Sequence, residues 1–211
     1  MNDKYYFKVK RKRPEETYND VSNYFRDDVL VQYANSKNMM KIQEKITIRA
    51  LELLDLQRKD ALILDAGSGP GFAAMVLKEM GYRTIALDII TEFLNFYDIK
   101  DLNPITADMC FPPFKANTFD AILSISALQW IYRDIYNKEM YLMLKNMSKS
   151  FFNILKPNSR VVIQFYPKNE KILENIGKVI KKSTAFYGHF IIDNPNSQRK
   201  RKIYLILNKE L

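Results

Sequence analysis

The feature that most constrains the fold is an apolar run that ends in a glycine-rich turn, LILDAGSGPG at residues 62–71. Three of the six glycines of the chain fall in its last five positions. Such a run is typical of a parallel strand buried on both faces, and glycines at its carboxyl end let the backbone approach a ligand. A helix from Phe72 to Met80, closed by Gly81, is predicted to follow. The stretch therefore predicts the strand, turn and helix that begin a doubly wound, nucleotide-binding domain.

The spacing of the glycines narrows the choice of ligand. A dinucleotide-binding turn needs a glycine at position 72, where this chain has Phe72. No Gly-Lys-Ser/Thr follows, which excludes a phosphate-binding P-loop. Gly67, Gly69 and Gly71 instead alternate after Asp65, as in the first motif of class I methyltransferases that bind S-adenosylmethionine. A plain tight turn between strand and helix would give the same glycines.

Two further aspartates follow the next two predicted strands. Asp88 ends the strand of residues 83–88, where a carboxylate can accept both hydroxyls of a ribose, although NAD enzymes place an acid there too. Asp108 and Met109 follow the next segment, and the methyltransferase pattern uses this pair to accept the adenine amine and to cover the ring. Three aspartates at successive strand ends favour a methyl-donor site. The predicted cofactor-binding residues are Asp65, Gly67, Ser68, Gly69, Asp88, Ile89, Asp108, Met109 and Ser124.

Composition limits the remaining possibilities. With 211 residues, of which 47% are apolar, the chain can bury one full-sized core, and we expect one domain. No apolar run has membrane-spanning length and no signal pattern occupies the first ten residues, so we expect a soluble, non-secreted protein without a membrane partner. One cysteine and one histidine leave no metal cluster to predict. Cys110 is interpreted as a small buried residue, and His189 as a surface or packed one.

The charge of the chain is positive and concentrated in two basic runs. The formal net charge is +9, with five cations among residues 8–13 and four in a row at residues 199–202. Aromatic residues precede the first run at positions 5–7, and Tyr204 follows the second. Cations that hold phosphates, beside rings that stack on unpaired bases, favour single-stranded RNA as the partner. Solvated tails or localisation signals are the alternative interpretation of such runs.

The rest of the chain alternates predicted helices and strands without an internal repeat. Helices are predicted over residues 21–33, 41–56, 138–155 and 169–182, and further strands over 119–125, 160–165, 190–192 and 203–207. The residues of the second helix that recur at helical spacing and should face the sheet are Ile42, Ile46, Ala50, Leu53 and Leu54. We predict an α/β fold: a doubly wound, mostly parallel sheet with an antiparallel C-terminal strand. A basic and aromatic segment, residues 1–36, would precede the domain of residues 37–211.

Five stretches carry a more specific pattern. They are RPEE (13–16) with YND (18–20), RALELL (49–54), SISALQW (124–130), QFYPKN (164–169), and DNPNS (193–197) with residues 200–207. In these stretches the chain resembles the small-subunit ribosomal RNA guanine-N(7) methyltransferases of ribosome biogenesis, in motif order from about Arg13 to Leu207. The third and fourth stretches are not general methyltransferase features. The family usually has Gly-Cys-Gly where this chain has Gly67-Ser68-Gly69, a change that a backbone-lined site should tolerate.

The resemblance implies a Rossmann-like class I methyltransferase that uses S-adenosylmethionine to methylate N(7) of a guanosine in small-subunit ribosomal RNA. The lone pair of N(7) is free at neutral pH, so we expect alignment, and no general base, to drive the transfer. Ser126, Trp130 and Tyr166 are predicted to position and stack the base, since an aromatic face attracts the purine as it becomes cationic. The predicted RNA contacts are Tyr18, Asn19, Lys10, Arg11, Arg13, Lys168, Arg199 and Arg201, with Tyr18 and Asn19 as a flap over the cofactor.

The resemblance also implies a partner and a location. The partner is a small zinc-binding activator subunit that pairs with a sheet edge to form a heterodimer. Eukaryotic members carry a basic C-terminal extension beyond the equivalent of Leu211, so we expect a cytoplasmic protein if it is archaeal, and one of the nucleus, nucleolus and cytoplasm if eukaryotic. Two alternatives stay open: a methyltransferase for another RNA, a protein or a small molecule, and a non-catalytic ribosome assembly factor that retains the cofactor pocket.

Overall fold

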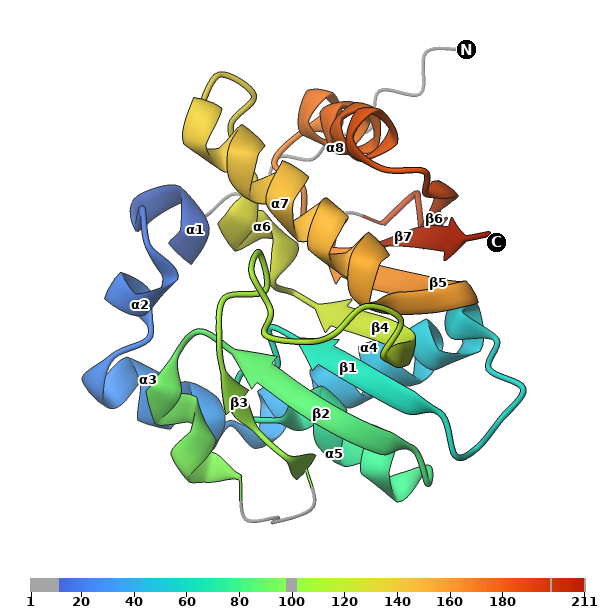
Figure 1. Ribbon diagram of the computed structural model, residues 1–211. Coiled ribbons are helices and arrows are strands. Elements are labelled where there is room, and N and C mark those ends of the chain that lie inside the picture. Colours follow the sequence, from blue (N-terminus) through green and yellow to red (C-terminus); the bar gives the residue numbers. More distant parts are fainter. Residues whose placement is uncertain (1–11, 98–101, 198, 211) are drawn as a thin grey trace.

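The strands of the chain form one seven-stranded sheet in the order β3-β2-β1-β4-β5-β7-β6 (Figure 1). The computed structural model describes residues 12–97, 102–197 and 199–210, so the predicted RNA contacts Lys10 and Arg11 lie outside it. The strands are β1 (Leu62–Ala66), β2 (Arg83–Asp88), β3 (Ile105–Thr106), β4 (Phe119–Ile125), β5 (Leu155–Phe165), β6 (Tyr187–Asp193) and β7 (Lys202–Lys209).

The direction of the strands confirms the predicted fold class. β1 pairs in parallel with β2 and β4, β2 pairs in parallel with β3, and β4 with β5. β7 lies between β5 and β6 and is antiparallel to both, so it alone runs against the other strands. The carboxyl ends of β1, β2 and β4 therefore meet at one edge of the sheet, where open α/β sheets bind their ligands.

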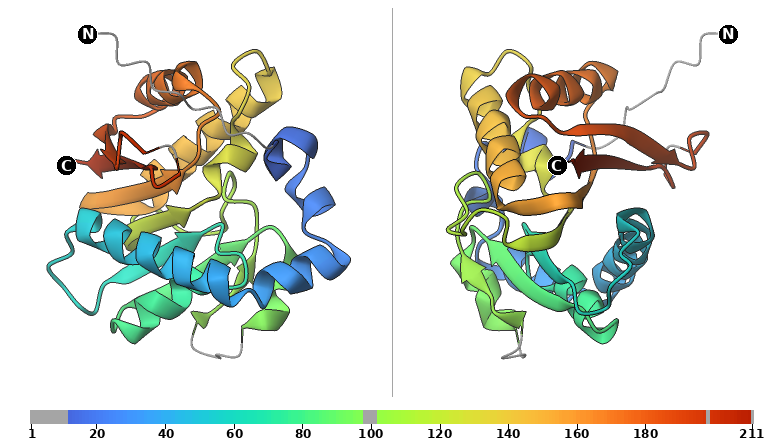
Figure 2. Two further views of the ribbon diagram at one scale, coloured as in Figure 1. Left: turned by 180° about the vertical axis from the view of Figure 1, so that it is seen from behind. Right: turned by 45° about the vertical axis from the view of Figure 1, so that its right-hand side comes forward.

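Helices cover both faces of this sheet. α4 and α5 lie on one face, and α6, α7 and α8 lie on the other (Figure 2). α1, α2 and α3 cross the edge at which β1, β2 and β4 end (Figure 1). The helices are α1 (Pro14–Thr17), α2 (Val21–Tyr24), α3 (Asp27–Ala34), α4 (Lys37–Leu54), α5 (Phe72–Glu79), the 3-10 helix η1 (Thr91–Phe96), α6 (Leu128–Ile131), α7 (Lys138–Ile154) and α8 (Glu170–Ser183).

The N-terminal helices differ from the prediction. The single helix expected over residues 21–33 is wrong, because the chain breaks at Phe25 into α2 and α3. The ring of Phe25 turns inward, with its centroid 5.1 Å from that of Phe93 and 6.0 Å from that of Trp130. This packing bends the chain over the strand ends, which a continuous helix would not allow. The division between segments 1–36 and 37–211 stays a prediction.

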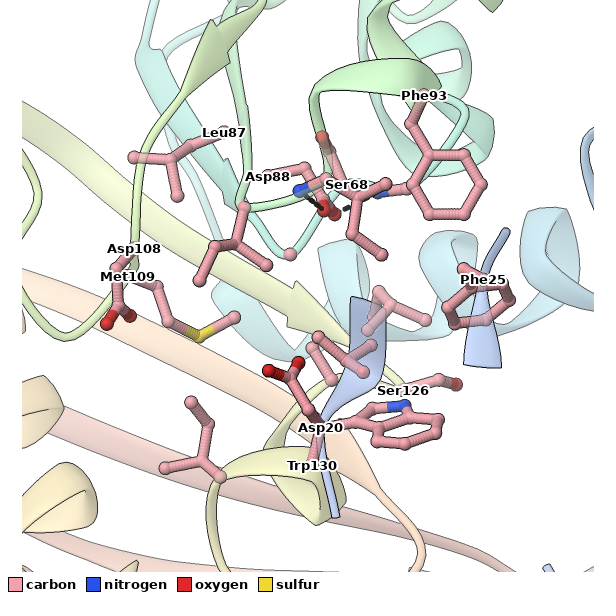
Figure 3. A pocket seen from close by; sticks show the side chains of 18 of the residues that line it. Asp20, Phe25, Ser68, Leu87, Asp88, Phe93, Asp108, Met109, Ser126 and Trp130 are labelled. Carbon is pink, nitrogen blue, oxygen red and sulfur yellow. Dashed lines mark hydrogen bonds between the residues drawn. The ribbon is translucent and has the colours of Figure 1, made fainter. Parts of the chain in front are cut away.

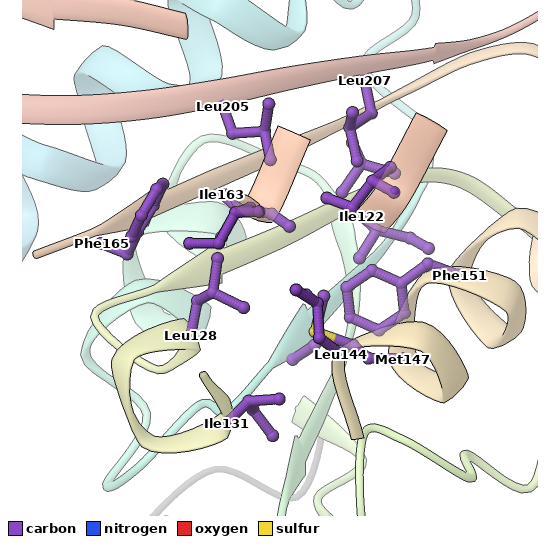
Figure 4. Close-up of a cluster of buried hydrophobic side chains, with 14 of the residues drawn as sticks. Ile122, Leu128, Ile131, Leu144, Met147, Phe151, Ile163, Phe165, Leu205 and Leu207 are labelled. Atoms are coloured by element: carbon purple, nitrogen blue, oxygen red, sulfur yellow. The ribbon is translucent and has the colours of Figure 1, made fainter. Parts of the chain in front are cut away.

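The core has two layers because neighbouring side chains of each strand point to opposite faces. Ile63 packs with the layer under α4 and α5, whereas Leu64 packs with the layer under α7, and both are fully buried. Figure 4 shows the second layer, in which Phe151 of α7 lies against Ile122 of β4. The apolar run is therefore covered on both faces, as predicted for a central parallel strand.

One prediction for α4 needs correction. Ile46, Ala50 and Leu54 are buried against the sheet, but Ile42 is 37% exposed. Gln43 is buried instead, at 7% exposure, and it lines the cavity described below. The first turns of α4 thus flank a polar cavity, where an amide is better placed than an apolar side chain.

Replacing Phe151 by alanine should lower the free energy of unfolding by about 3–5 kcal/mol, because the side chain is fully buried and its loss leaves a cavity. Urea denaturation followed by circular dichroism measures the change. Phe111→Ala is the matched control, since Phe111 is 66% exposed and its loss should change stability by less than about 0.5 kcal/mol. Equal losses for the two variants would contradict the assigned core.

Candidate functional site

A cavity of about 460 Å³ lies at the carboxyl ends of β1, β2 and β4, beneath the N-terminal helices (Figure 3). Its walls come from the glycine turn, the ends of β2 and β4, the loop after β3, α2, α3, α6 and the start of α7. Short segments that are far apart in the sequence therefore share one cavity, as expected where the strand order of a parallel sheet reverses.

Asp65 is the most deeply buried acid of the cavity. Asp65 is 1% exposed, and neither carboxylate oxygen makes a hydrogen bond of ordinary geometry within the described residues, although the backbone amide of Ala74 in α5 lies near enough to lower the pKa of Asp65 in part. Burial and the neighbouring carboxylate of Asp88 raise the pKa of Asp65 to about 7. An unpartnered buried carboxylate is costly, and a cationic ligand in the cavity would offset that cost.

Asp88 is held in place by the backbone. Its Oδ2 accepts a hydrogen bond from the amide of Gly69 at 2.7 Å, and its Oδ1 accepts one from the amide of Ile90 at 2.9 Å. Burial raises the pKa of this carboxyl. Asp88 lines the cavity, and each of its carboxylate oxygens can accept a second hydrogen bond. It is therefore an oriented acceptor suited to hydroxyl groups of a ligand.

Two glycines of the turn are required by close approach. Gly67 has φ +76°, and a Cβ there would lie 2.5 Å from Cβ of Ala127 and 2.8 Å from Cε of Met109. Gly71 has φ +89°, and its Cβ would lie 2.7 Å from the ring of Tyr97. Both positions also have the left-handed backbone that favours glycine. The Tyr97 hydroxyl donates to Oγ of Ser68 at 2.7 Å, which fixes the turn from outside.

The loop after β3 forms another wall. Oδ1 of Asp108 accepts from the amide of Cys110 at 2.8 Å, and Met109 reaches across to Gly67. Ile89, which follows β2, also lines the cavity and is 52% exposed. Cys110 is fully buried, as predicted, and burial raises the pKa of its thiol. This wall combines one acceptor with apolar surface, the chemistry that an adenine ring needs.

An aromatic wall closes the cavity beyond β4. The indole of Trp130 stacks on Tyr24 with centroids 5.8 Å apart and planes at 28°, and Phe25 packs beside it. Ser126 has a left-handed backbone, with φ +58°, and its Oγ donates to Oε1 of Gln164 at 2.9 Å. Figure 3 shows Ser126 and Trp130 near one another, away from Asp108 and Met109. The cavity thus has a side lined by acids and a side lined by rings.

The structure brings most of the predicted site residues together. Those that line the cavity are Asp65, Gly67, Ser68, Gly69, Asp88, Ile89, Asp108, Met109, Ser126, Trp130 and Asn19. Ser124 is not among them: it is 1% exposed, and its Oγ donates to the carbonyl oxygen of Ala66 at 2.7 Å. Its side chain therefore joins β4 to β1 beneath the cavity. Tyr166 does not line the cavity either, and its ring lies near Arg13 and Lys202, with centroid distances of 5.8 and 5.3 Å.

The predicted RNA contacts are spread over the surface. Tyr18 is 40% exposed, and Lys168 and Arg199 are exposed as well. Arg13 donates from Nη1 to the carbonyl oxygen of Tyr166 at 2.7 Å, and Arg201 from Nε to that of Pro195 at 3.0 Å. These two arginines therefore have structural partners, and the predicted RNA contacts of the whole group remain predictions.

Arg133 is a residue of the site that is not predicted from the sequence. Its Nη1 donates to the carbonyl oxygen of Trp130 at 3.0 Å, and its Nη2 donates to that of Asn19 at 3.0 Å and of Tyr18 at 3.3 Å. One guanidinium thus ties the N-terminal segment to the aromatic wall. Every residue has a backbone carbonyl, so hydrogen bonds to backbone carbonyls do not require a partner of a particular type. No sequence pattern therefore predicts them.

Among residues 12–97, 102–197 and 199–210, no group of three or more His, Cys, Asp and Glu side chains is arranged to hold a metal ion. In the same ranges no helix has the length and apolar character needed to cross a membrane.

The residues of the cavity fit S-adenosylmethionine. The orphaned carboxylate of Asp65 suits a ligand with cationic groups, Asp88 suits a ribose, and a Cβ at Gly67 would fill the space beside Met109. The fold and this site define a class I methyltransferase that depends on S-adenosylmethionine. Residues 64–163 also match the family model described as a methyltransferase domain.

The chain belongs to the 18S rRNA (guanine-N(7))-methyltransferase family. It is 30% identical over 203 residues to the enzyme bud23 of Schizosaccharomyces pombe, covering 92% of this chain and 71% of the relative. It is 34% identical over 201 residues to the 18S rRNA (guanine(1575)-N(7))-methyltransferase of Saccharomyces cerevisiae, covering 93% and 72%. A putative methyltransferase of Haloferax volcanii, solved in complex with the Trm112 methyltransferase activator, shares the fold with TM-score 0.61 and 16% identity, over 88% of this chain and 99% of that one.

Gly67→Ala should weaken the binding of S-adenosylmethionine by about a hundredfold or more, because the new methyl group must displace Ala127 or Met109 at the cavity wall. Isothermal titration calorimetry measures the affinity. Gly81→Ala is the matched control: Gly81 has φ +89°, but a Cβ there meets no atom within 4 Å. Both substitutions place a Cβ on a left-handed backbone, which costs about 1–2 kcal/mol of stability, but only Gly67→Ala should weaken the binding of S-adenosylmethionine. Equal affinities of Gly67→Ala and Gly81→Ala would contradict the assignment of Gly67 to the cofactor-binding site.

Asp65→Asn should raise the melting temperature of the cofactor-free protein at pH 8.5 more than at pH 5.5. The folded-state pKa of about 7 lies above the ordinary value of 3.8, so the contribution of the protonated acid to stability is lost as pH rises through about 7. Asparagine cannot ionise and avoids that loss. Calorimetry across this pH range measures the difference, and a difference that stays constant or shrinks with rising pH would show that Asp65 is not a buried, unpaired acid.

Proposed function

We propose that this protein transfers the methyl group of S-adenosylmethionine to N(7) of a guanosine in small-subunit ribosomal RNA during ribosome biogenesis. The observation that carries the proposal is the match to two named 18S rRNA (guanine-N(7))-methyltransferases over more than nine-tenths of the chain. The cavity supports it, because acids that suit the donor and rings that suit a base open into the same space.

This reaction requires the protein to align the methyl donor with guanine N(7) more than it requires a proton transfer. When bound, S-adenosylmethionine supplies a methyl group on a positively charged sulfur, and guanine N(7) offers a free lone pair. The Ser126 hydroxyl already donates a hydrogen bond to Oε1 of Gln164, and Asp88 is fixed by two backbone amides. These side chains therefore orient ligands. Oriented binding of this kind removes much of the entropic barrier of a two-substrate reaction.

Trp130 is the residue we assign to the base. Tyr24 covers the indole by stacking, and Arg133 holds the backbone of Trp130 in place. The indole also lines the cavity, so a base can stack on it there. A purine that gains positive charge during methylation is held more tightly by an electron-rich ring, and this contact therefore strengthens as the transition state is approached.

A small zinc-binding activator protein is the partner that we propose. The Haloferax volcanii methyltransferase of similar fold was solved in complex with the Trm112 methyltransferase activator. In this chain β3 is an edge strand of the sheet, and the exposed apolar side chains include Val29 and Val31 of α3 and Ile89, which follows β2. A partner that pairs with β3 and covers these side chains would form the heterodimer. Assembly would take place where small subunits mature: the nucleus or nucleolus of a eukaryote, or the cytoplasm of an archaeon.

The proposal is tested on ribosomal RNA itself. Small-subunit ribosomal RNA from cells that lack the protein is incubated with the protein, its activator and S-adenosylmethionine carrying a labelled methyl group, and is then mapped by mass spectrometry. Labelled 7-methylguanosine at one position is the expected result. Label in protein or small molecules, with none in RNA, would favour another methyltransferase. No transfer, together with normal ribosome maturation in an Asp88→Ala strain, would indicate a non-catalytic assembly factor.

Trp130→Ala should lower kcat/KM for this RNA by about tenfold or more, while the dissociation constant for S-adenosylmethionine changes by less than about threefold. Trp130→Phe keeps a ring and should recover part of the rate. Filter assays with the labelled methyl donor give the rates, and calorimetry gives the affinity. If Trp130→Ala reacts as fast as the wild type, the assignment of the indole to the base is wrong.

A further inference from the structure

Asp20 is an acidic residue of the cavity to which the reaction above gives no role. It precedes α2, is exposed, and lines the cavity, and Figure 3 shows its carboxylate directed toward the cavity. The chain as a whole carries a formal charge of +9. An anion at the entrance for a polyanionic RNA opposes binding, unless it meets hydrogen-bond donors that the RNA brings.

The carboxylate of Asp20 is oriented before any ligand arrives. Its Oδ1 accepts from the amide of Ser22 at 2.9 Å and from Oγ of Ser22 at 2.8 Å, which caps the start of α2. Oδ2 makes no hydrogen bond to any part of the chain that the structure describes. One oxygen thus fixes the group, and the other is free to accept from a ligand.

The same carboxylate is held near Trp130. Arg133 donates to the carbonyl oxygen of Asn19, the residue before Asp20, and to that of Trp130, both at 3.0 Å. A single planar guanidinium therefore couples the backbone that carries the acid to the backbone that carries the ring. Tyr24, at the end of α2, stacks on the indole and adds a second link between them. Asp20 and Trp130 therefore line the same part of the cavity, so a base stacked on the indole would lie within that part.

We propose that Asp20 reads the Watson–Crick edge of the guanine that is methylated, an inference that rests on the proposed function and deepens it. A guanine whose N(7) faces the methyl donor turns its N1–H and N2–H donors away from that donor. A carboxylate only accepts, so it matches these two donors. Adenine has an acceptor at N1 and no amino group at C2, so it meets the carboxylate with a lone pair. Asp20 therefore selects guanine over adenine.

Asp20→Asn and Asp20→Ser separate recognition from helix capping, because asparagine and serine also cap helices well. Both should reduce kcat/KM for small-subunit ribosomal RNA by about tenfold to a hundredfold, the cost of losing hydrogen bonds to a charged acceptor. The dissociation constant for S-adenosylmethionine should stay within about twofold of the wild type. Asp28→Asn is the matched control: Asp28 is an exposed acid of α3 that does not line the cavity, and its change should leave the rate unaltered.

An inosine substrate tests the contact from the RNA side. Inosine lacks the N2 amino group, so the wild type should methylate RNA with inosine at the mapped position about tenfold more slowly than RNA with guanosine. In Asp20→Ser this preference should fall to less than about twofold, since the acceptor is gone. Rates of Asp20→Asn equal to the wild type, or an inosine penalty equal in the wild type and Asp20→Ser, would overturn the inference and leave the proposed function intact. Methyl transfer by the wild type to no RNA at all would overturn both.

Discussion

The structure depends on the convergence of three parallel strands on one edge of a sheet, with a carboxylate buried where they meet. Asp65, the last residue but one of β1, has almost no solvent exposure and no hydrogen bond of ordinary geometry among the described residues, a position that folding alone does not favour. The surrounding apolar layers, packed on both faces of β1, hold it there. The cost is consistent with a functional site, because strained or unpaired groups persist where a ligand compensates for them.

The second constraint is the attachment of the N-terminal helices to the aromatic wall. Without α1, α2 and α3 the strand ends would form an open edge, and the cavity would lack the side that carries Asn19 and Phe25. The helices are too short to be stable alone, so their position comes from packing of Phe25 on Phe93 and from the hydrogen bonds of Arg133. The part of the cavity that we assign to the methyl donor is therefore formed by the topology of the sheet. The part that we assign to the base is formed by contacts between side chains and backbone.

That difference explains how far the sequence could predict the structure. The strands follow from apolar periodicity, and the turn and the acids after them can be read directly from the sequence, because these are local signals. The antiparallel direction of the C-terminal strand is not local and follows only from the resemblance to class I methyltransferases. Ile42 is predicted to face the sheet but is exposed, because a cavity and not the sheet lies beside the first turns of α4. Apolar periodicity does not show where a sheet ends. The motifs of Ser124 and Tyr166 predict that both belong to the site, whereas the structure places the Ser124 hydroxyl on the carbonyl oxygen of Ala66 and the Tyr166 ring near Lys202. These contacts depend on neighbours that the motifs do not contain, and the roles of both residues stay predictions. Arg133 and Asp20 act through backbone contacts and capping, which only the folded chain brings together.

We assign the methyl donor to the cavity at the strand ends, and the affinity of one variant for S-adenosylmethionine tests that assignment most directly. Asp88 lines the cavity as an oriented acceptor, so Asp88→Ala removes a contact without filling space. Calorimetric titration of the wild type and Asp88→Ala with S-adenosylmethionine should show an affinity at least about a hundredfold weaker in a variant that remains folded. Equal affinities in the two folded proteins would contradict the account.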